Sequence, residues 1–163
     1  MTSTALDASR VESLLEDFDN TMLVTHADGR LHARPMRVVE RSAGGSLYLV
    51  SGADSGKVAE IEANAAVTLT FQDARQFLVL SGGARPTRDR ALIERLWSDA
   101  WRVWFPQGKE DPNICLIQVE PTEAEYWDNR GARGLKYAFQ AARAYATGHT
   151  PRPDPDQHGK VRL

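Results

Sequence analysis

The stretch "LYLVSGADSGKVAEIEANAAVTLTF", residues 47–71, joins two predicted strands through a short helix. Residues 47–50 are apolar, and a strand is predicted over residues 44–52. A helix is predicted from about residue 54 to residue 63, with Val58 and Ile61 as its inward positions. Residues 66–73 alternate apolar and polar side chains, which is typical of a half-exposed strand. The chain therefore leaves a strand through small and polar residues and places one lysine, Lys57, at the start of a helix.

The start of this predicted helix has the composition of an anion site. Backbone N–H groups at a helix start, together with the Ser55 hydroxyl and the Lys57 ammonium, suit a terminal phosphate. The Asp54 carboxylate would repel a phosphate unless it points away or caps the helix. The alternative interpretation is a capped helix with a solvated lysine, because short Ser/Gly/Lys runs are common at helix starts.

A hairpin is predicted upstream, over residues 20–39, with its turn at Asp28 and Gly29. Pro35 lies inside the second strand, and because proline has no N–H to donate, it indicates an edge, a bulge or a break. Arg34 and Arg37 fall on opposite faces of that strand. A planar polar ligand could bind the freed backbone there, and the alternative is an edge strand with surface arginines.

The remaining pattern predicts a largely antiparallel barrel of six or seven strands with three or four helices outside it. Further strands are expected over residues 76–85, 114–121 and 123–128, and further helices over residues 7–18, from Thr87 through Trp97, and over residues 134–148. We expect one domain, residues 1–148, followed by a proline-rich C-terminal tail, residues 149–163.

Three of the four tryptophans, Trp97, Trp101 and Trp104, are spaced for one helix face. One interpretation is a helix that packs on the barrel or across a dimer interface, and another is a set of rings that cover a flat cofactor. Such an aromatic stripe exceeds what one small barrel usually covers. The sequence therefore predicts a homodimer.

Composition excludes several classes of protein. The 163 residues include 20 basic and 22 acidic ones, so no general basic field favours nucleic acid or an anionic membrane. The one cysteine, Cys115, cannot form a disulfide within the chain and is expected to be a buried strand residue. No signal-peptide pattern and no apolar run of about 20 residues is present, which favours a cytoplasmic protein. The four histidines lack metal-site spacing, and no nucleophile–base motif identifies catalytic residues.

The order of these segments resembles the general stress protein branch of the pyridoxamine 5'-phosphate oxidase-like proteins. The resemblance covers about residues 8–130 and rests on the hairpin, the stretch quoted above, "LSGGA", the tryptophan-rich segment ending "WFPQG", and "DPNICLIQVEPTEAEYWD". It implies an antiparallel FMN-binding split β-barrel that forms a homodimer, with two flavin sites at the subunit interface.

The resemblance also implies which residues hold the flavin. Ser55 and Lys57 would hold the phosphate, and Gln76 and Trp104 would reach the flavin from the partner subunit. The residues that would line the flavin ring and its ribityl chain are Arg34, Pro35, Met36, Arg37, Val50 and Ser51.

Two departures argue against activity as a pyridoxamine 5'-phosphate oxidase. The oxidases carry two adjacent basic residues at the phosphate, whereas Gly56 precedes Lys57 here, so that Arg34 or Arg37 would have to compensate. The residues after Trp127 also lack the arginine-bearing substrate motif. The sequence leaves open a flavin-dependent oxidoreductase that acts on a small molecule or a nicotinamide reductant, and a non-catalytic protein that binds flavin or another ligand. A deazaflavin-dependent reductase is a third option, which would need more basic residues near Lys57 than the sequence offers.

Overall fold

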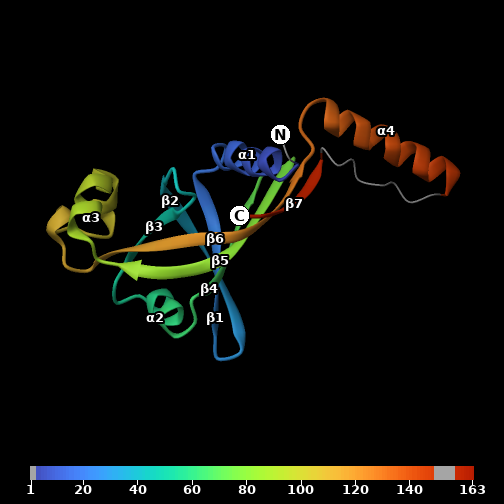
Figure 1. Ribbon diagram of the computed structural model, residues 1–163. Coiled ribbons are helices and arrows are strands. Elements are labelled where there is room, and N and C mark those ends of the chain that lie inside the picture. The colour runs from blue at the N-terminus through green and yellow to red at the C-terminus, as the bar shows by residue number, and fades with distance from the viewer. Residues whose placement is uncertain (1–2, 149–156) are drawn as a thin grey trace.

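The structure is a computed structural model that describes residues 3–148 and 157–163. Its centre is an antiparallel barrel in the strand order β3-β2-β1-β4-β5-β6, which closes through pairing of β3 with β6, while β7 extends the sheet beyond β6 (Figure 1). The strands are β1 (Asn20–Ala27), β2 (Arg30–Arg41), β3 (Leu47–Gly52), β4 (Ala66–Gln72), β5 (Gln76–Thr87), β6 (Ile114–Asp128) and β7 (His158–Arg162). The predicted fold class is confirmed.

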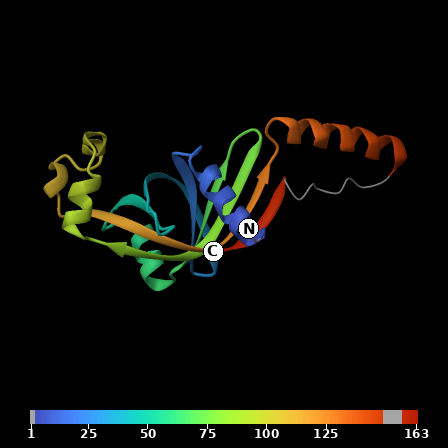
Figure 2. The same cartoon turned by 45° about the horizontal axis from the view of Figure 1, so that its top comes forward.

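Helices surround the barrel. α1 lies against β5 and β7, α2 lies against β1 and β5, and α4 extends away from the barrel (Figures 1 and 2). The helical segments are α1 (Ser3–Leu15), α2 (Gly56–Ala63), α3 (Arg90–Leu96), the 3₁₀ turns η1 (Asp99–Val103) and η2 (Gly108–Glu110), and α4 (Ala132–Thr147).

The predicted hairpin forms as β1 and β2. Asp28 and Gly29 have φ angles of 50° and 71°, which are the left-handed values that a tight two-residue turn requires. Pro35 lies opposite Met22 of β1, whereas β3 pairs with β2 only from Val38 onward. The other edge of β2 is therefore open at Pro35, where a residue without an N–H is tolerated.

The alternating stretch after α2 supplies β4 and part of the core. Val67, Leu69 and Phe71 are buried, as their period of two predicts. Leu69 pairs with Leu23 of β1 and Leu80 of β5, and all three side chains are almost fully inaccessible to solvent. This layer of leucines fills the centre of the barrel.

The last part of the barrel differs from the sequence prediction. The two strands expected over residues 114–121 and 123–128 are one strand, β6, which continues past Pro121 opposite a bulge in β5 at Ser81 and Gly82. A Cβ at position 82 would lie 2.1 Å from the Glu120 carbonyl oxygen, so only glycine permits this approach. Cys115 is fully buried in β6, as predicted.

The predicted helix with three tryptophans on one face is wrong. α3 ends at Leu96, and residues 99–103 form a separate 3₁₀ turn because the Ser98 hydroxyl accepts a hydrogen bond from the Ala100 N–H and starts a new turn. α3 also begins later than the predicted start at Thr87, because Asp89 caps it by accepting a bond from the Leu92 N–H. The three rings consequently lie in different environments.

The end of the predicted tail is a strand. β7 pairs with residues 123–127 of β6, and the His158 ring stacks on Trp127 with a centroid separation of 5.0 Å. Residues 149–156 of the predicted tail lie outside the described residues.

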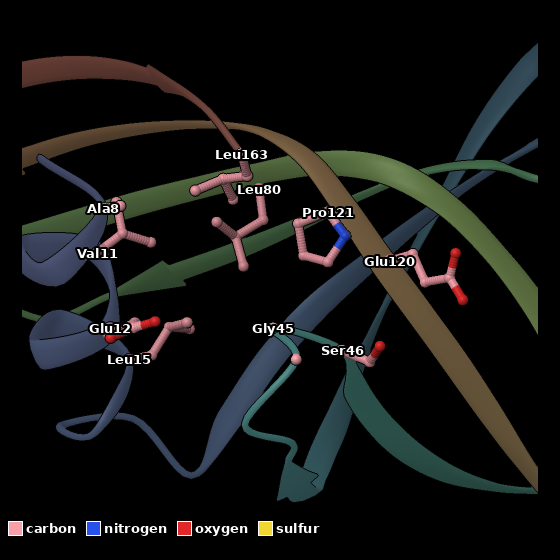
Figure 3. Close-up of a pocket in the computed structure, with 11 residues that line it drawn as sticks. Ala8, Val11, Glu12, Leu15, Gly45, Ser46, Leu80, Glu120, Pro121 and Leu163 are labelled. Carbon is pink, nitrogen blue, oxygen red and sulfur yellow. The ribbon is translucent and has the colours of Figure 1, made fainter. Parts of the chain in front are cut away.

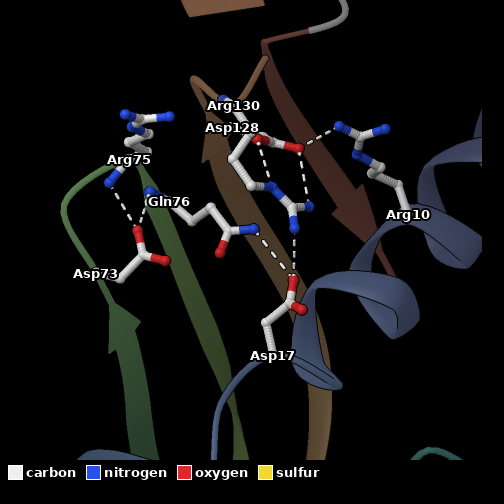
Figure 4. Close-up of polar contacts among 7 residues, drawn as sticks. All are labelled: Arg10, Asp17, Asp73, Arg75, Gln76, Asp128 and Arg130. Atoms are coloured by element: carbon white, nitrogen blue, oxygen red, sulfur yellow. Dashed lines mark hydrogen bonds and ion pairs between the residues drawn. The ribbon is translucent and has the colours of Figure 1, made fainter.

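A cluster of charged side chains joins α1 to the point where β6 ends (Figure 4). Asp128 is fully buried and forms ion pairs with Arg10 of α1 and with Arg130. Arg130 also donates to Asp17 at 2.7 Å, and Gln76 donates to the same carboxylate oxygen at 3.1 Å. Burial alone would raise the pKa of Asp128, but the bonds from Arg130 outweigh it and the pKa lies below its usual value.

Candidate functional site

A pocket lies where β2, β3, the start of α2 and η1 meet. Its cavity volume is about 390 Å³, which falls in the range of small-molecule sites, ~300–1,000 Å³. The residues that line it are Pro35, Met36, Arg37, Val50, Ser51, Gly52, Asp54, Ser55, Lys57, Trp101, Trp104, Phe105 and Asn113.

One end of the pocket is a cluster of hydrogen-bonding groups from β3 and α2. The Lys57 ammonium donates to Ser51 Oγ at 3.2 Å, and the hydroxyls of Ser51 and Ser55 lie 2.9 Å apart. Ser55 holds the N-cap position of α2, yet its side chain makes no capping bond. The first turn of a helix also leaves backbone N–H groups without intrahelical partners. Two hydroxyls, an ammonium and these N–H groups form a donor set suited to an oxyanion.

Partial burial, followed by the charge of Arg34, holds the pKa of Lys57 below its usual range, and the carboxylates of Glu60 and Asp54 oppose that shift. Arg34 itself points away from the pocket, toward Thr25 of β1 and Glu60 of α2. It donates to Thr25 Oγ1 at 2.5 Å and forms an ion pair with Glu60 at 2.8 Å. Glu60 therefore compensates the charge of Arg34, and Arg34 does not line the pocket.

Arg37 is the second cation of the pocket. Within the part of the chain that the structure describes, its guanidinium has no hydrogen-bond or ion-pair partner, and its side chain is exposed. Its position on the face opposite Arg34 follows from the alternation of β2. Of the two arginines that could supplement Lys57, only Arg37 faces the same cavity.

The other wall of the pocket is apolar. Met36, Trp101 and Phe105 are buried side chains that line it, and Trp104 lines it while remaining 66% exposed. Trp101 also packs edge-on against Trp97, with ring centroids 5.6 Å apart. Flat and apolar side chains thus face the cavity opposite the polar end.

The structure brings together eight of the ten residues predicted for the site, and it places Arg34 and Gln76 elsewhere. Trp104 is one of the eight, but it lines the pocket of its own chain, whereas the resemblance implied that it reaches the flavin from the partner subunit. Gln76 is buried, and its amide donates to Asp17. Its predicted contact with the flavin of a partner subunit stays a prediction. Sequence reasoning did not assign Asn113, which binds Asp54, because nothing in the local sequence links residues 59 positions apart.

A second cavity, of about 400 Å³, lies between α1, the turn before β3 and Leu163 (Figure 3). Its walls are mainly apolar, with Leu15 and Leu80 among them, and the described residues that line it include two glutamates, Glu12 and Glu120, but no basic residue. This cavity does not suit an anion.

The sequence matches the pattern of the family described as "pyridoxamine 5'-phosphate oxidase like" over residues 7–152. Because this match spans most of the chain, the protein belongs to that family, and the predicted resemblance is confirmed. A search of curated proteins gave no match.

Solved structures of general stress proteins share the fold. A general stress protein 26 from Jannaschia sp. CCS1 is 23% identical, with a TM-score of 0.71 over 97% of this chain and 99% of its own. General stress protein 26 from Bacillus anthracis is 22% identical, with a TM-score of 0.65 over 72% and 91%. The general stress FMN/FAD binding protein of Xanthomonas citri is 27% identical, with a TM-score of 0.63 over 79% and 92%. Among the described residues, no helix has the length and apolar character needed to span a membrane.

Proposed function

We propose that the protein binds FMN in the pocket between β3, α2 and η1 and acts as a flavin-dependent oxidoreductase on a small molecule. The observation that carries this proposal is the donor cluster of Ser51, Ser55 and Lys57 at one end of a cavity whose other wall is aromatic. FMN has the matching parts, a phosphate and a flat ring. The similarity to the FMN/FAD binding protein of Xanthomonas citri supports the same ligand.

The residues present fit the cofactor in their chemistry. Ser51, Ser55 and Lys57 would hold the phosphate. Arg37 would add positive charge, which Gly56 does not provide at the position where the oxidases carry a basic residue. The rings of Trp101 and Trp104 offer contact surface for the flavin. When bound, FMN supplies a ring that accepts a hydride and passes electrons on, and the protein's part is to bind and orient it.

A homodimer is part of the proposal. Val103 and Trp104 are consecutive residues that are 81% and 66% exposed, and Trp104 lines the pocket. Adjacent large apolar side chains at a pocket rim favour cover by another subunit. A partner subunit would shield the flavin from water there.

A non-catalytic flavin-binding protein is the second candidate. The described residues that line the pocket include no histidine, the side chain that most often moves protons in catalysis, and the two other acid–base candidates, Asp54 and Lys57, are hydrogen-bonded to Asn113 and Ser51. This composition favours binding over acid–base chemistry.

One experiment separates the two candidates. The protein loaded with FMN is reduced by NADH or NADPH, and electron transfer to quinone, nitro and ferric acceptors is compared with that of free FMN at the same concentration. Faster transfer than free FMN supports the oxidoreductase. Transfer no faster than that of free FMN for every acceptor supports the binding protein.

A further inference from the structure

Asp54 is the one acidic side chain among the described residues of the pocket, and it is fixed there. Its Oδ1 accepts a hydrogen bond from Asn113 Nδ2 at 2.9 Å, and its backbone N–H donates to Asn113 Oδ1 at 3.2 Å. The carboxylate packs over Gly52, where a Cβ would lie only 2.9 Å from Asp54 Oδ1. Asp54 thus does not cap α2, and although the residue is exposed to solvent, Asn113 holds its carboxylate at the pocket.

The loop that carries Asn113 is itself fastened. The Ala53 N–H donates to the Asn113 carbonyl oxygen at 2.7 Å, and the Asn113 N–H donates to Asp111 Oδ1 at 2.9 Å. Asp111 is buried. The Asp54 carboxylate is therefore held from the β6 side by backbone and side-chain bonds.

The Asp54 carboxylate forms no ion pair with a cation among the described residues, and it offsets part of the positive charge of the pocket. Its bonding partner, Asn113, is neutral, while Arg34 and Glu60 neutralise each other outside the cavity. Asp54 is close enough to Lys57 to act on it electrostatically. The lining residues Arg37, Lys57 and Asp54 carry a formal charge of +1 together. A phosphate monoester carries about −1.5 to −2 at pH 7.

We propose that Asp54 is a specificity-determining residue, which opposes the phosphate charge of the ligand and keeps a flavin phosphate exchangeable. This inference rests on the proposed function, because it concerns the strength with which the same pocket binds FMN. An exchangeable flavin is one that the protein takes up and releases. Riboflavin, which lacks the phosphate, is not subject to this repulsion.

The test is a titration of the native chain and of Asp54→Asn with FMN and with riboflavin, at low and at high salt. The amide oxygen that this substitution introduces can still accept the bond from Asn113 Nδ2, so the change removes charge and keeps shape. FMN should bind the variant roughly 5- to 30-fold more tightly at low salt. The gain should shrink at high salt, and riboflavin affinity should stay within about twofold.

Two further variants act as controls. Glu62→Gln removes a charge from the exposed side of α2, outside the pocket, and should leave FMN affinity within about twofold. Asp54→Ser, which also removes the carboxylate, replaces Asp54→Asn if that variant does not fold.

Each outcome decides the inference. FMN binding by the native chain, with equal or weaker binding by both Asp54 variants, overturns it while the proposed function stands. A similar gain for riboflavin also overturns it, because a loss of repulsion cannot act on a ligand without phosphate. Binding by the variants alone contradicts FMN binding by the native chain, and with it an exchangeable flavin, so it overturns both. If none of the proteins binds FMN, the proposed function and this inference are both wrong.

Discussion

The Ser55 hydroxyl lies 2.9 Å from Ser51 Oγ instead of capping α2, whose N-cap position Ser55 occupies. An N-cap serine ordinarily accepts a bond from the N–H of the first turn, and its loss typically costs a helix ~1 kcal/mol. Ser55 instead joins the end of β3 to the start of α2, beside the Lys57 ammonium. The first-turn N–H groups of α2 therefore lack the serine oxygen as acceptor, which is consistent with a ligand in the pocket that accepts their hydrogen bonds.

Glu60 should make the stability of the protein depend on pH. The Thr25 hydroxyl, followed by His32 and Arg34, lowers the pKa of Glu60 to about 2 from an ordinary value of 4.5. Because the folded state favours the ionised form, this stabilisation is complete above about pH 4.5 and is lost as the pH falls toward 2.

Urea unfolding at a series of pH values measures this effect. Glu60→Gln should lower the free energy of unfolding at pH 7, and its stability should fall less steeply than that of the native chain below about pH 4.5. Glu62→Gln, on the same helix, should follow the native curve. Parallel curves for the native chain and Glu60→Gln would contradict the assignment.

The buried carboxylate of Asp128 should contribute to the attachment of α1. Asp128→Asn should lower the free energy of unfolding by about 1–3 kcal/mol, because Arg10 and Arg130 lose a charged partner that is shielded from water. Asp99→Asn breaks an aspartate–arginine pair in which Asp99 is 82% exposed, and it should leave the unfolding midpoint nearly unchanged. Equal effects of the two changes in urea unfolding would show that burial does not set the strength of the Asp128 cluster.

The proposed homodimer should depend on Val103. Val103→Asp places a charge on a side chain that is 81% exposed in the single chain, so the fold should be retained. If a second subunit covers this position, the dissociation constant of the dimer, measured by sedimentation equilibrium, should rise by about tenfold or more. Leu31→Asp, at a 66% exposed leucine in the distant β1–β2 hairpin, serves as the control. A native chain that is monomeric at micromolar concentration would contradict the dimer.

Much of the barrel could be predicted because its signals are local. The Asp28–Gly29 turn marks the first hairpin, and the alternation around Leu69 identifies the buried face of β4. The continuation of β6 past Pro121 was missed because proline usually ends a strand, and it depends on the bulge opposite at Gly82. The pairing of β7 was missed because the residues of the C-terminal segment carry little apolar signal of their own.

The candidate site was predictable only where neighbours in sequence are also neighbours in space. Ser51, Ser55 and Lys57 belong to one stretch, and the structure brings them together. The alternation of β2 separates Arg34 from Arg37, but which of them faces the pocket depends on where α2 packs and where Glu60 lies. The ion pair between Arg34 and Glu60 could not be predicted from the sequence of β2 or of α2 alone.

The most direct test of the account is an FMN titration of the native chain and of Lys57→Ala, followed by flavin fluorescence. Removal of a bond to a charged phosphate should cost about 1.5–3 kcal/mol, which corresponds to roughly 10- to 150-fold weaker binding. Lys160→Ala, at a lysine on β7 that is 64% exposed, should bind FMN like the native chain. Saturable FMN binding by the native chain and by Lys160→Ala, weakened in Lys57→Ala, is the predicted result, and unchanged FMN affinity in Lys57→Ala, or no binding by the native chain, would contradict the flavin site.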